Sequence, residues 1–226
     1  MKLKELMFFS FIMIIFTTVS YSQNKYLTTK DSDKEAIDII KETQRKLKEA
    51  SSIEFDYTYT SRMKDDAPVE VNGIGKQKSG KYYIEMGDQT IYCDGKSIVI
   101  YFNTNNEAQI NDLDEDSGQL TPGAILNTFD TESYIYVLSV DRKIKNKAFY
   151  NIIFKPVDKY SEYIKVDVLI DKKTFLPYQI KMLMKDGSKN ILKINSIKMN
   201  QKINDNVFIF DSSKHPGVSV EDLRMN

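Results

Sequence analysis

Few side chains in this sequence have the chemistry of a catalytic centre. The chain has one histidine, His215 in the stretch SSKHPGVSV, and one cysteine, Cys93. A Ser-His-Asp triad could use only His215, and the Pro-Gly pair that follows it is typical of a surface turn. One His and one Cys far apart in sequence do not predict a zinc site, and we interpret Cys93 as a small buried hydrophobe. The motifs G-x-S-x-G, G-x-x-x-x-G-K-[ST] and H-E-x-x-H are absent from the sequence, so binding is favoured over catalysis.

An acidic run, NDLDEDSG, places Asp112, Asp114 and Asp116 at alternate positions, as in a calcium-binding loop. The sharp turn of such a loop requires glycine where this chain has Ser117, and the position of its bidentate glutamate is taken by Gly123. We therefore interpret the run as a solvated loop and expect neither a metal nor a cofactor. No pair of carboxylates stands out for glycoside chemistry, and we expect no enzymatic activity.

The elements that must position any ligand are mostly β-strands. In PYQIKMLMKDG, the side chains of Tyr178, Ile180, Met182 and Met184 share one parity, and the other parity is mostly polar. The Asp-Gly pair at the end of this stretch is typical of a tight turn. Roughly ten segments of the chain alternate in this way. The pattern predicts a large antiparallel sheet with one apolar and one polar face.

Helices are expected in two places. Residues 33–50 carry a narrow apolar stripe at helical spacing, and Thr121 can cap a short helix that starts with Pro122. These helices are too small to cover one face of so large a sheet, and a single sheet of that size tends to curl or split. Two folds remain open. One is a β-sandwich, which would suit an exported interaction or adhesion module, and the other is a barrel or half-barrel around a space.

The first 22 residues have the pattern of a signal peptide. The basic start MKLKE precedes the apolar run LMFFSFIMIIFTTV, and SYS supplies small residues before an expected cleavage between Ser22 and Gln23. No cysteine stands directly after this run at the expected cleavage site, so we expect no N-terminal lipid anchor. Residues 23–226 are expected to form one domain. They contain 30 basic and 31 acidic residues, a balance that does not favour nucleic-acid binding.

Five stretches, in order along the chain, resemble the periplasmic outer-membrane lipoprotein carrier (LolA) family. They are SSIEFDYTYT, GIGKQKSGKYYIEM, IYCDGKSIVIYF, TPGAILNTF and VFIFDSSKHPGVSVEDL. Each is a common pattern by itself, but their order behind a signal peptide makes the resemblance specific. It covers residues 33–224.

The resemblance implies a mainly β fold with a few helices, an incomplete antiparallel β-barrel with a helical lid over an apolar cavity. It also implies a monomeric periplasmic carrier without catalytic activity. Such a carrier takes acylated lipoproteins from an inner-membrane lipoprotein-releasing transporter to an outer-membrane acceptor. A paralogue that carries another lipid or a lipopeptide is the alternative. Burial of each acyl methylene gains about 0.8 kcal/mol, so the carrier needs a large apolar surface.

The apolar residues of the alternating strands are the candidate lipid contacts. They are Phe55, Tyr57, Tyr82, Ile84, Met86, Ile98, Ile100, Val168, Ile180, Met182, Met184 and Ile194. The lid is expected to be formed by Ile125, Leu126 and Phe129. For each of these residues, core packing and lipid contact both remain open. Methionine is flexible and polarizable, which suits a changing apolar partner.

The chain departs from the best-known family members in its strands and in its lid. The turn Lys78-Ser79-Gly80 stands where those members carry Arg-Pro or Lys-Pro, and Ile84 stands where a tryptophan is expected. Gly123 and Ala124 in the lid stand where bulkier apolar residues are usual. We therefore expect a lid that packs less tightly.

Overall fold

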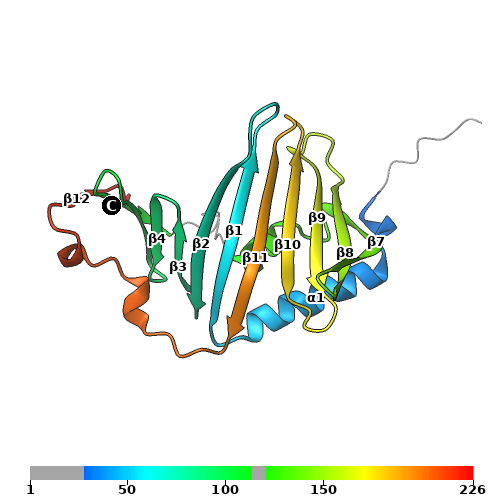
Figure 1. Ribbon diagram of the computed structural model, residues 1–226, viewed down its shortest axis with the longest axis horizontal. Helices are drawn as coiled ribbons and strands as arrows, with labels where there is room; N and C mark the ends of the chain where they lie inside the picture. Colours follow the sequence, from blue (N-terminus) through cyan, green and yellow to red (C-terminus); the bar gives the residue numbers. More distant parts are fainter. Residues whose placement is uncertain (1–27, 114–120, 226) are drawn as a thin grey trace, which may run out of the picture.

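The computed structural model of the protein describes residues 28–113 and 121–225 (Figure 1). The expected signal peptide, residues 1–22, lies outside the described residues, as do Asp114 and Asp116 of the acidic run. The helices are α1 (Lys34–Glu49), α2 (Pro122–Thr128) and the 3₁₀ turns η1 (Thr29–Asp31), η2 (Asp205–Phe208) and η3 (Ser212–Lys214). The strands are β1 (Ile53–Arg62), β2 (Val69–Lys78), β3 (Lys81–Met86), β4 (Gln89–Cys93), β5 (Ser97–Phe102), β6 (Glu107–Asp112), β7 (Tyr134–Ile144), β8 (Lys147–Pro156), β9 (Tyr163–Asp171), β10 (Pro177–Met184), β11 (Lys189–Met199) and β12 (Ser219–Asp222).

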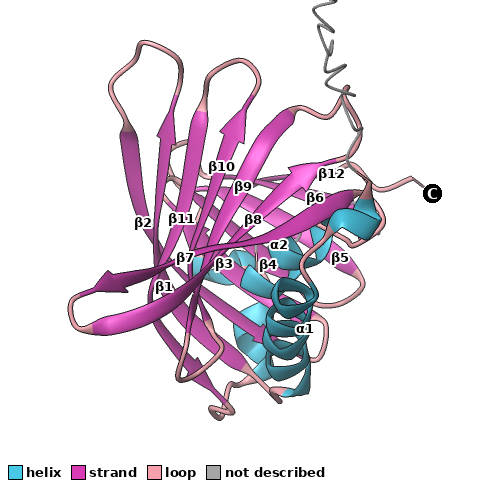
Figure 2. Ribbon diagram, turned by 90° about the vertical axis from the view of Figure 1, so that its right-hand side faces the viewer, coloured by secondary structure: helices cyan, strands magenta, loops and turns pink. Residues whose placement is uncertain are grey.

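All described strands belong to one 12-stranded sheet in the order β12-β6-β5-β4-β3-β2-β1-β11-β10-β9-β8-β7. Neighbours pair antiparallel, except that β12 pairs parallel with β6. Because β1 pairs with both β2 and β11, it joins the meander of β2–β6 to the meander of β7–β11. The sheet curls, and α1 and α2 lie on its concave side (Figure 2). Its end strands do not pair with each other, so the barrel is incomplete and the expected fold is confirmed. The sandwich alternative is wrong, because the described strands form one sheet.

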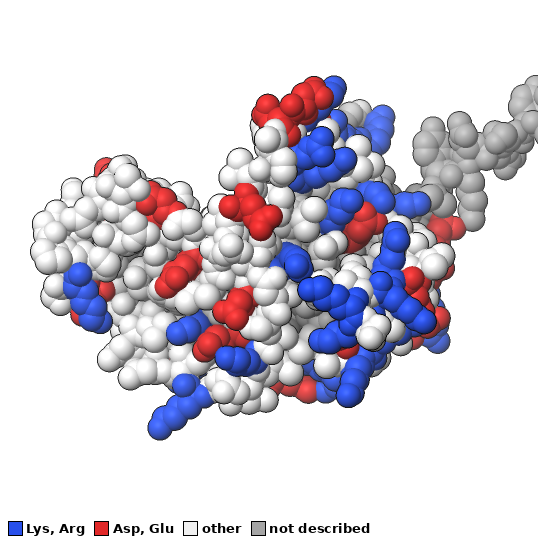
Figure 3. Space-filling model, in the orientation of Figure 1, with Lys and Arg blue, Asp and Glu red and all other residues white. Residues whose placement is uncertain are grey.

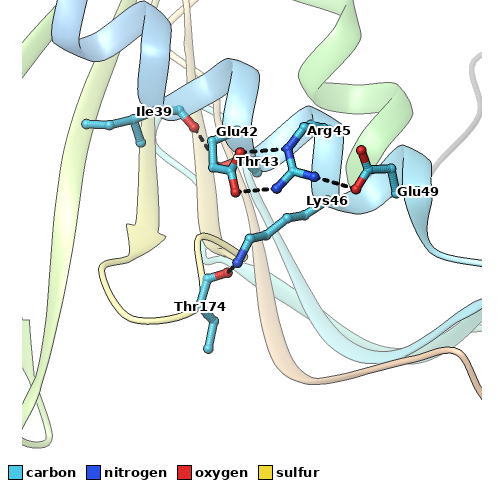
Figure 4. A network of polar contacts seen from close by, with 7 residues as sticks. All are labelled: Ile39, Glu42, Thr43, Arg45, Lys46, Glu49 and Thr174. Carbon is cyan, nitrogen blue, oxygen red and sulfur yellow. Dashed lines mark hydrogen bonds and ion pairs between the residues drawn. The ribbon is translucent and has the colours of Figure 1, made fainter.

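Helix α1 covers the concave side with the apolar stripe that its sequence predicts. Its buried residues are Ala36, Ile39, Ile40, Thr43 and Leu47. Its polar side is held by local contacts (Figure 4). There the Arg45 guanidinium bonds the Glu42 and Glu49 carboxylates, and the Lys46 ammonium donates to the Thr174 carbonyl oxygen at 2.9 Å. The last contact ties the helix to the turn between β9 and β10.

The C-terminal segment, residues 200–218 between β11 and β12, covers the convex side of β3–β5. The ring of Phe210 packs against Tyr92 and Tyr101, with centroids 5.6 and 5.5 Å apart. The Asp205 carboxylate pairs with the ammonium groups of Lys78 at 2.6 Å and Lys81 at 2.9 Å. These lysines flank the turn that departs from the family pattern. That turn therefore anchors the C-terminal segment in this chain.

Candidate lipid-binding interior

The concave face brings the expected lipid contacts together in one apolar cluster. Eight of them are buried and belong to the cluster: Phe55, Tyr57, Tyr82, Ile84, Ile98, Val168, Ile180 and Ile194. Met86, Ile100 and Met182 are half-buried and pack against its edge. The alternation of each strand produces this result, because side chains two residues apart point to the same face of a sheet.

Met184, the remaining expected contact, lies at the end of β10. The register between β9 and β10 shifts between Leu183 and Met184, but the extra residue is Ile164 on β9. Met184 therefore keeps the parity of Met182 and lies opposite Tyr163, which packs against the cluster. Met184 is half-buried and lies outside the apolar cluster. A second shift, between Pro177 and Gln179, displaces Tyr178 from the parity of Ile180. Irregularities of this kind move a side chain to the other face of a strand.

Tyr178 packs on the convex side. Its ring lies against Phe149, with centroids 4.6 Å apart. Phe149 is buried but does not belong to the concave cluster, and it lies opposite Asp171 in the register of β8 and β9. The convex face therefore has a small apolar patch of its own.

The lid helix α2 is positioned by its cap and by Phe129, the residue after its last turn. The Thr121 hydroxyl oxygen accepts from the Ala124 amide at 3.2 Å, and Pro122 begins the helix as expected. Leu126 and Phe129 are buried with 0% and 1% of their surface exposed, and Ile125 is half-buried against the cluster.

The seat of the lid is aromatic, and the sequence analysis did not identify it. The Phe129 ring lies 5.2 Å from Tyr134, 5.5 Å from Phe154 and 5.6 Å from Tyr163, measured between centroids. The Tyr136 hydroxyl donates to the Phe129 carbonyl oxygen. Burial raises the pKa of Tyr136 to about 12, so the hydroxyl remains a donor at neutral pH. The period-two spacing of Tyr134 and Tyr136 is only a partial signal, because Ile135, Val137 and Leu138 beside them are apolar as well.

The sheet separates between β2 and β3. These strands pair only over Gly75–Lys78 and Lys81–Ile84, although β2 begins at Val69. Tyr57 reaches across the separation, and its hydroxyl donates to the Glu85 carbonyl oxygen at 2.7 Å. Burial raises the pKa of Tyr57 to about 12. The neutral phenol thus replaces part of the missing ladder.

The interior is lined by apolar and uncharged side chains. Every residue of the buried cluster is apolar or aromatic, apart from the thiol of Cys93. Burial raises the pKa of the Cys93 thiol and of the neighbouring Tyr82 phenol, so both are neutral. Among the described residues, Gln77 Oε1 is a buried side-chain acceptor without a hydrogen-bond partner. Uncharged walls of this kind suit hydrocarbon.

The one histidine of the sequence lies outside this interior. His215 stacks on Phe210, with centroids 5.1 Å apart, and both lie on the convex side. His215 also lines a pocket of about 250 Å³ between the C-terminal segment and strands β2–β4, together with Tyr83 and Lys76. In the described ranges, no group of three His, Cys, Asp or Glu side chains is placed to hold a metal ion. Nor does any helix in the described part of the chain have the length and apolarity to span a membrane.

Comparison with known proteins agrees with this architecture. Residues 49–211 match the family model described as "Outer membrane lipoprotein carrier protein LolA". An uncharacterized conserved protein from Thermus thermophilus has a similar solved structure, with a TM-score of 0.55 at 11% identity, over 83% of this chain and 99% of that one. A LolA superfamily protein from Nitrosomonas europaea gives a TM-score of 0.40 at 16% identity, over 77% of this chain and 97% of that one.

LprF from Mycobacterium bovis gives a TM-score of 0.49 at 8% identity, over 76% of this chain and 96% of that one. The sequence has no match among curated proteins. The Thermus thermophilus structure supports the fold alone, whereas the family model spans most of the chain. By that match, the protein belongs to the outer-membrane lipoprotein carrier (LolA) family.

Proposed function

We propose that this protein is a periplasmic carrier that holds the acyl chains of lipoproteins in its concave apolar interior. It takes its cargo from an inner-membrane lipoprotein-releasing transporter and delivers it to an outer-membrane acceptor. It works as a monomer, without catalysis or a cofactor, after removal of residues 1–22. Membership of a family of carrier proteins supports this role.

The observation that carries the proposal is the continuous apolar surface between the curled sheet and helices α1 and α2. Each methylene that leaves water gains about 0.8 kcal/mol, so a lipid anchor leaves the bilayer only for a surface of comparable apolarity. The buried cluster offers this surface, and none of the described residues that are buried carries a charged side chain. Burial of an ion in this interior would cost more desolvation free energy than its contacts there could return.

Acyl chains need space, and the lid must move to provide it. Leu126 and Phe129 are almost fully buried, so α2 fills part of the interior when no cargo is present. The half-buried residues Met86 and Met182 lie at the edge of the cluster. Their unbranched side chains can rearrange around a ligand at low cost. Displacement of the lid and rearrangement of the methionines together would admit hydrocarbon.

A fluorescent fatty-acid analogue tests this proposal. The folded protein should bind it stoichiometrically, and a triacylated lipopeptide should displace it. If a demonstrably folded protein ignores the probe, the carrier hypothesis is wrong. Displacement by free fatty acids or phospholipids, but not by the lipopeptide, would favour the paralogue that carries another lipid. Native mass spectrometry of protein purified from its own periplasm would then identify the co-purifying acylated species.

A further inference from the structure

The convex face of the sheet is strongly basic over its C-terminal half. Figure 3 shows Lys and Arg side chains gathered over the area where Figure 1 labels β8–β11. The lid helices lie on the opposite, concave side of the sheet (Figure 2). The charge therefore does not belong to the apolar interior.

The strand registers assign six cations to this surface. Their immediate neighbours in the strands, such as Val166, Ile180, Leu192 and Ile194, belong to the concave cluster, so the cations point the other way. We name this surface the basic face and define it by Arg62, Lys155, Lys165, Lys181, Lys189 and Lys193.

The arrangement is unfavourable for the isolated protein. Arg62 on β1 lies directly opposite Lys189 on β11. Lys181 on β10 lies opposite Ile191, between Lys189 and Lys193 of β11, and its other cross-strand neighbour is Asp167 of β9. Like charges on opposed positions of a sheet destabilise it. An external anionic partner would relieve this repulsion.

Nearby carboxylates neutralise the basic face only in part. Asp167 pairs with Lys165 at 3.0 Å, and the Asp171 carboxylate accepts from the amides of Lys173 and Thr174 at 2.9 and 3.0 Å. Within residues 28–113 and 121–225, the remaining five cations have no ion pair or side-chain hydrogen bond. They are Arg62, Lys155, Lys181, Lys189 and Lys193.

The form of the basic face indicates the kind of partner. Its charges are spread over five strands and are mostly lysines, whose long side chains adapt to moving groups. Protein interfaces are usually centred on packed aromatic or arginine anchors. Here the residues between the lysines are the half-buried aliphatics Leu183 and Ile191. A diffuse positive field of this kind matches an array of anionic lipid headgroups. Each Lys or Arg near the membrane surface adds to the binding free energy.

We propose that the basic face docks the protein on a bilayer surface rich in anionic phospholipid. Docking through the convex side leaves α1 and α2 facing away from the bilayer, where they can move and meet partner proteins. The proposal does not depend on acyl binding, because the two surfaces lie on opposite sides of the sheet. Failure of one leaves the other intact.

Vesicle co-sedimentation tests this inference with protein isolated from the periplasm, its N-terminus defined by mass spectrometry. Vesicles of phosphatidylcholine alone are compared with vesicles that also contain phosphatidylglycerol. The test variant is Lys181→Glu/Lys193→Glu, and the control is Lys48→Glu/Lys96→Glu, which makes the same charge change at two exposed lysines elsewhere. Lys181→Gln/Lys193→Gln serves if the charge reversal prevents folding.

We expect binding only to the anionic vesicles, weakened by salt between about 50 and about 300 mM. The Lys181→Gln/Lys193→Gln variant should lose about thirtyfold in affinity, since two cations leave the surface, and the charge reversal should lose at least as much. The control should stay within about twofold of the wild-type protein. Equal binding by test variant and wild type, or equal binding to both vesicle types, would overturn the inference. An absence of vesicle binding would overturn it as well. In that case, salt-sensitive binding to polyglutamate would assign the basic face to an acidic protein partner.

Discussion

The Tyr57 hydroxyl donates a hydrogen bond across strand β2 to the backbone carbonyl oxygen of Glu85, 2.7 Å away. The bond crosses over Gly73, which has no side chain to obstruct it. A Cβ at position 73 would lie 2.1 Å from that carbonyl oxygen and 2.6 Å from the Tyr57 hydroxyl oxygen. The absence of a side chain at Gly73 thus allows the Tyr57 hydroxyl to link β1 to β3 where β2 and β3 stop pairing.

Substitution at either position should destabilise the protein. Tyr57→Phe leaves the Glu85 carbonyl without this donor and should cost about 1 kcal/mol. Gly73→Ala forces the Tyr57 ring or strand β3 to move and should cost about 1–3 kcal/mol. Urea unfolding measures both changes. Tyr59→Phe, in the same strand but half-buried, is the control and should cost less. A Gly73→Ala variant as stable as wild type would contradict this account of the separation.

A charge at the edge of the interior should separate cargo binding from folding. Met182→Glu places a carboxylate on the concave side, at a half-buried position where water can still reach it. The empty protein should fold with a modest loss of thermal stability, and its affinity for a fatty-acid analogue should fall at least about tenfold.

Gln179→Glu is the matched control for this prediction. It introduces the same residue in the same strand, at a convex position opposite Lys193. Thermal unfolding and probe binding of this variant should both resemble wild type. If Met182→Glu unfolds while the control does not, Met182 is ordinary core and takes no part in cargo binding.

Acid should release the C-terminal segment. The hydrogen bonds from Lys78 and Lys81 lower the pKa of Asp205 to about 2, below the ordinary value of about 3.9. A carboxyl group whose pKa is lowered in the folded state stabilises the fold at pH values above its pKa in the unfolded chain. That contribution is lost as pH falls from about 4 towards about 2. Limited proteolysis should therefore cut the segment faster in this window.

Removal of the charge should have the same effect at neutral pH. Asp205→Asn should expose the segment to protease at pH 7 and remove its acid dependence, because no carboxyl remains to titrate. Glu221→Gln, an exposed position in β12, should change neither. Protection of the segment in Asp205→Asn would show that the Phe210 packing, and not the ion pairs, holds it in place.

The alternation of apolar and polar residues predicted most of the interior, because successive side chains of any β-strand point to opposite faces. Tyr82, Ile84 and Met86 needed only a period of two to reach the same face. Tyr178 could not be placed in this way, because a register shift depends on the neighbouring strand and has no clear signal in the strand itself.

The aromatic seat of the lid was missed for a different reason. The stretch from Tyr134 to Leu138 is apolar at nearly every position, so its pattern does not distinguish a helix from a buried strand. Pairing with β8 decides the matter and puts Tyr136 opposite Phe154. The departure at Gly123 was visible in the sequence, but its packing against Leu47 depends on how α2 meets α1. Tertiary contacts of this kind are not encoded in local spacing.

Locking the lid should block cargo exchange without unfolding the protein. A Cβ at Gly123 in α2 would lie 3.8 Å from Leu47 Cβ in α1, which is close to the mean separation in disulfides. The variant Leu47→Cys/Gly123→Cys, with Cys93→Ala to remove the native thiol, should therefore oxidise to a bridge between the two helices. If α2 must move to admit acyl chains, the oxidised form should bind a fatty-acid analogue at least about tenfold more slowly. Reduction should restore the rate, and each single cysteine variant should respond to neither treatment. Unchanged binding by the oxidised form would mean that acyl chains enter elsewhere, and the separation between β2 and β3 beside Tyr57 would be the next route to test.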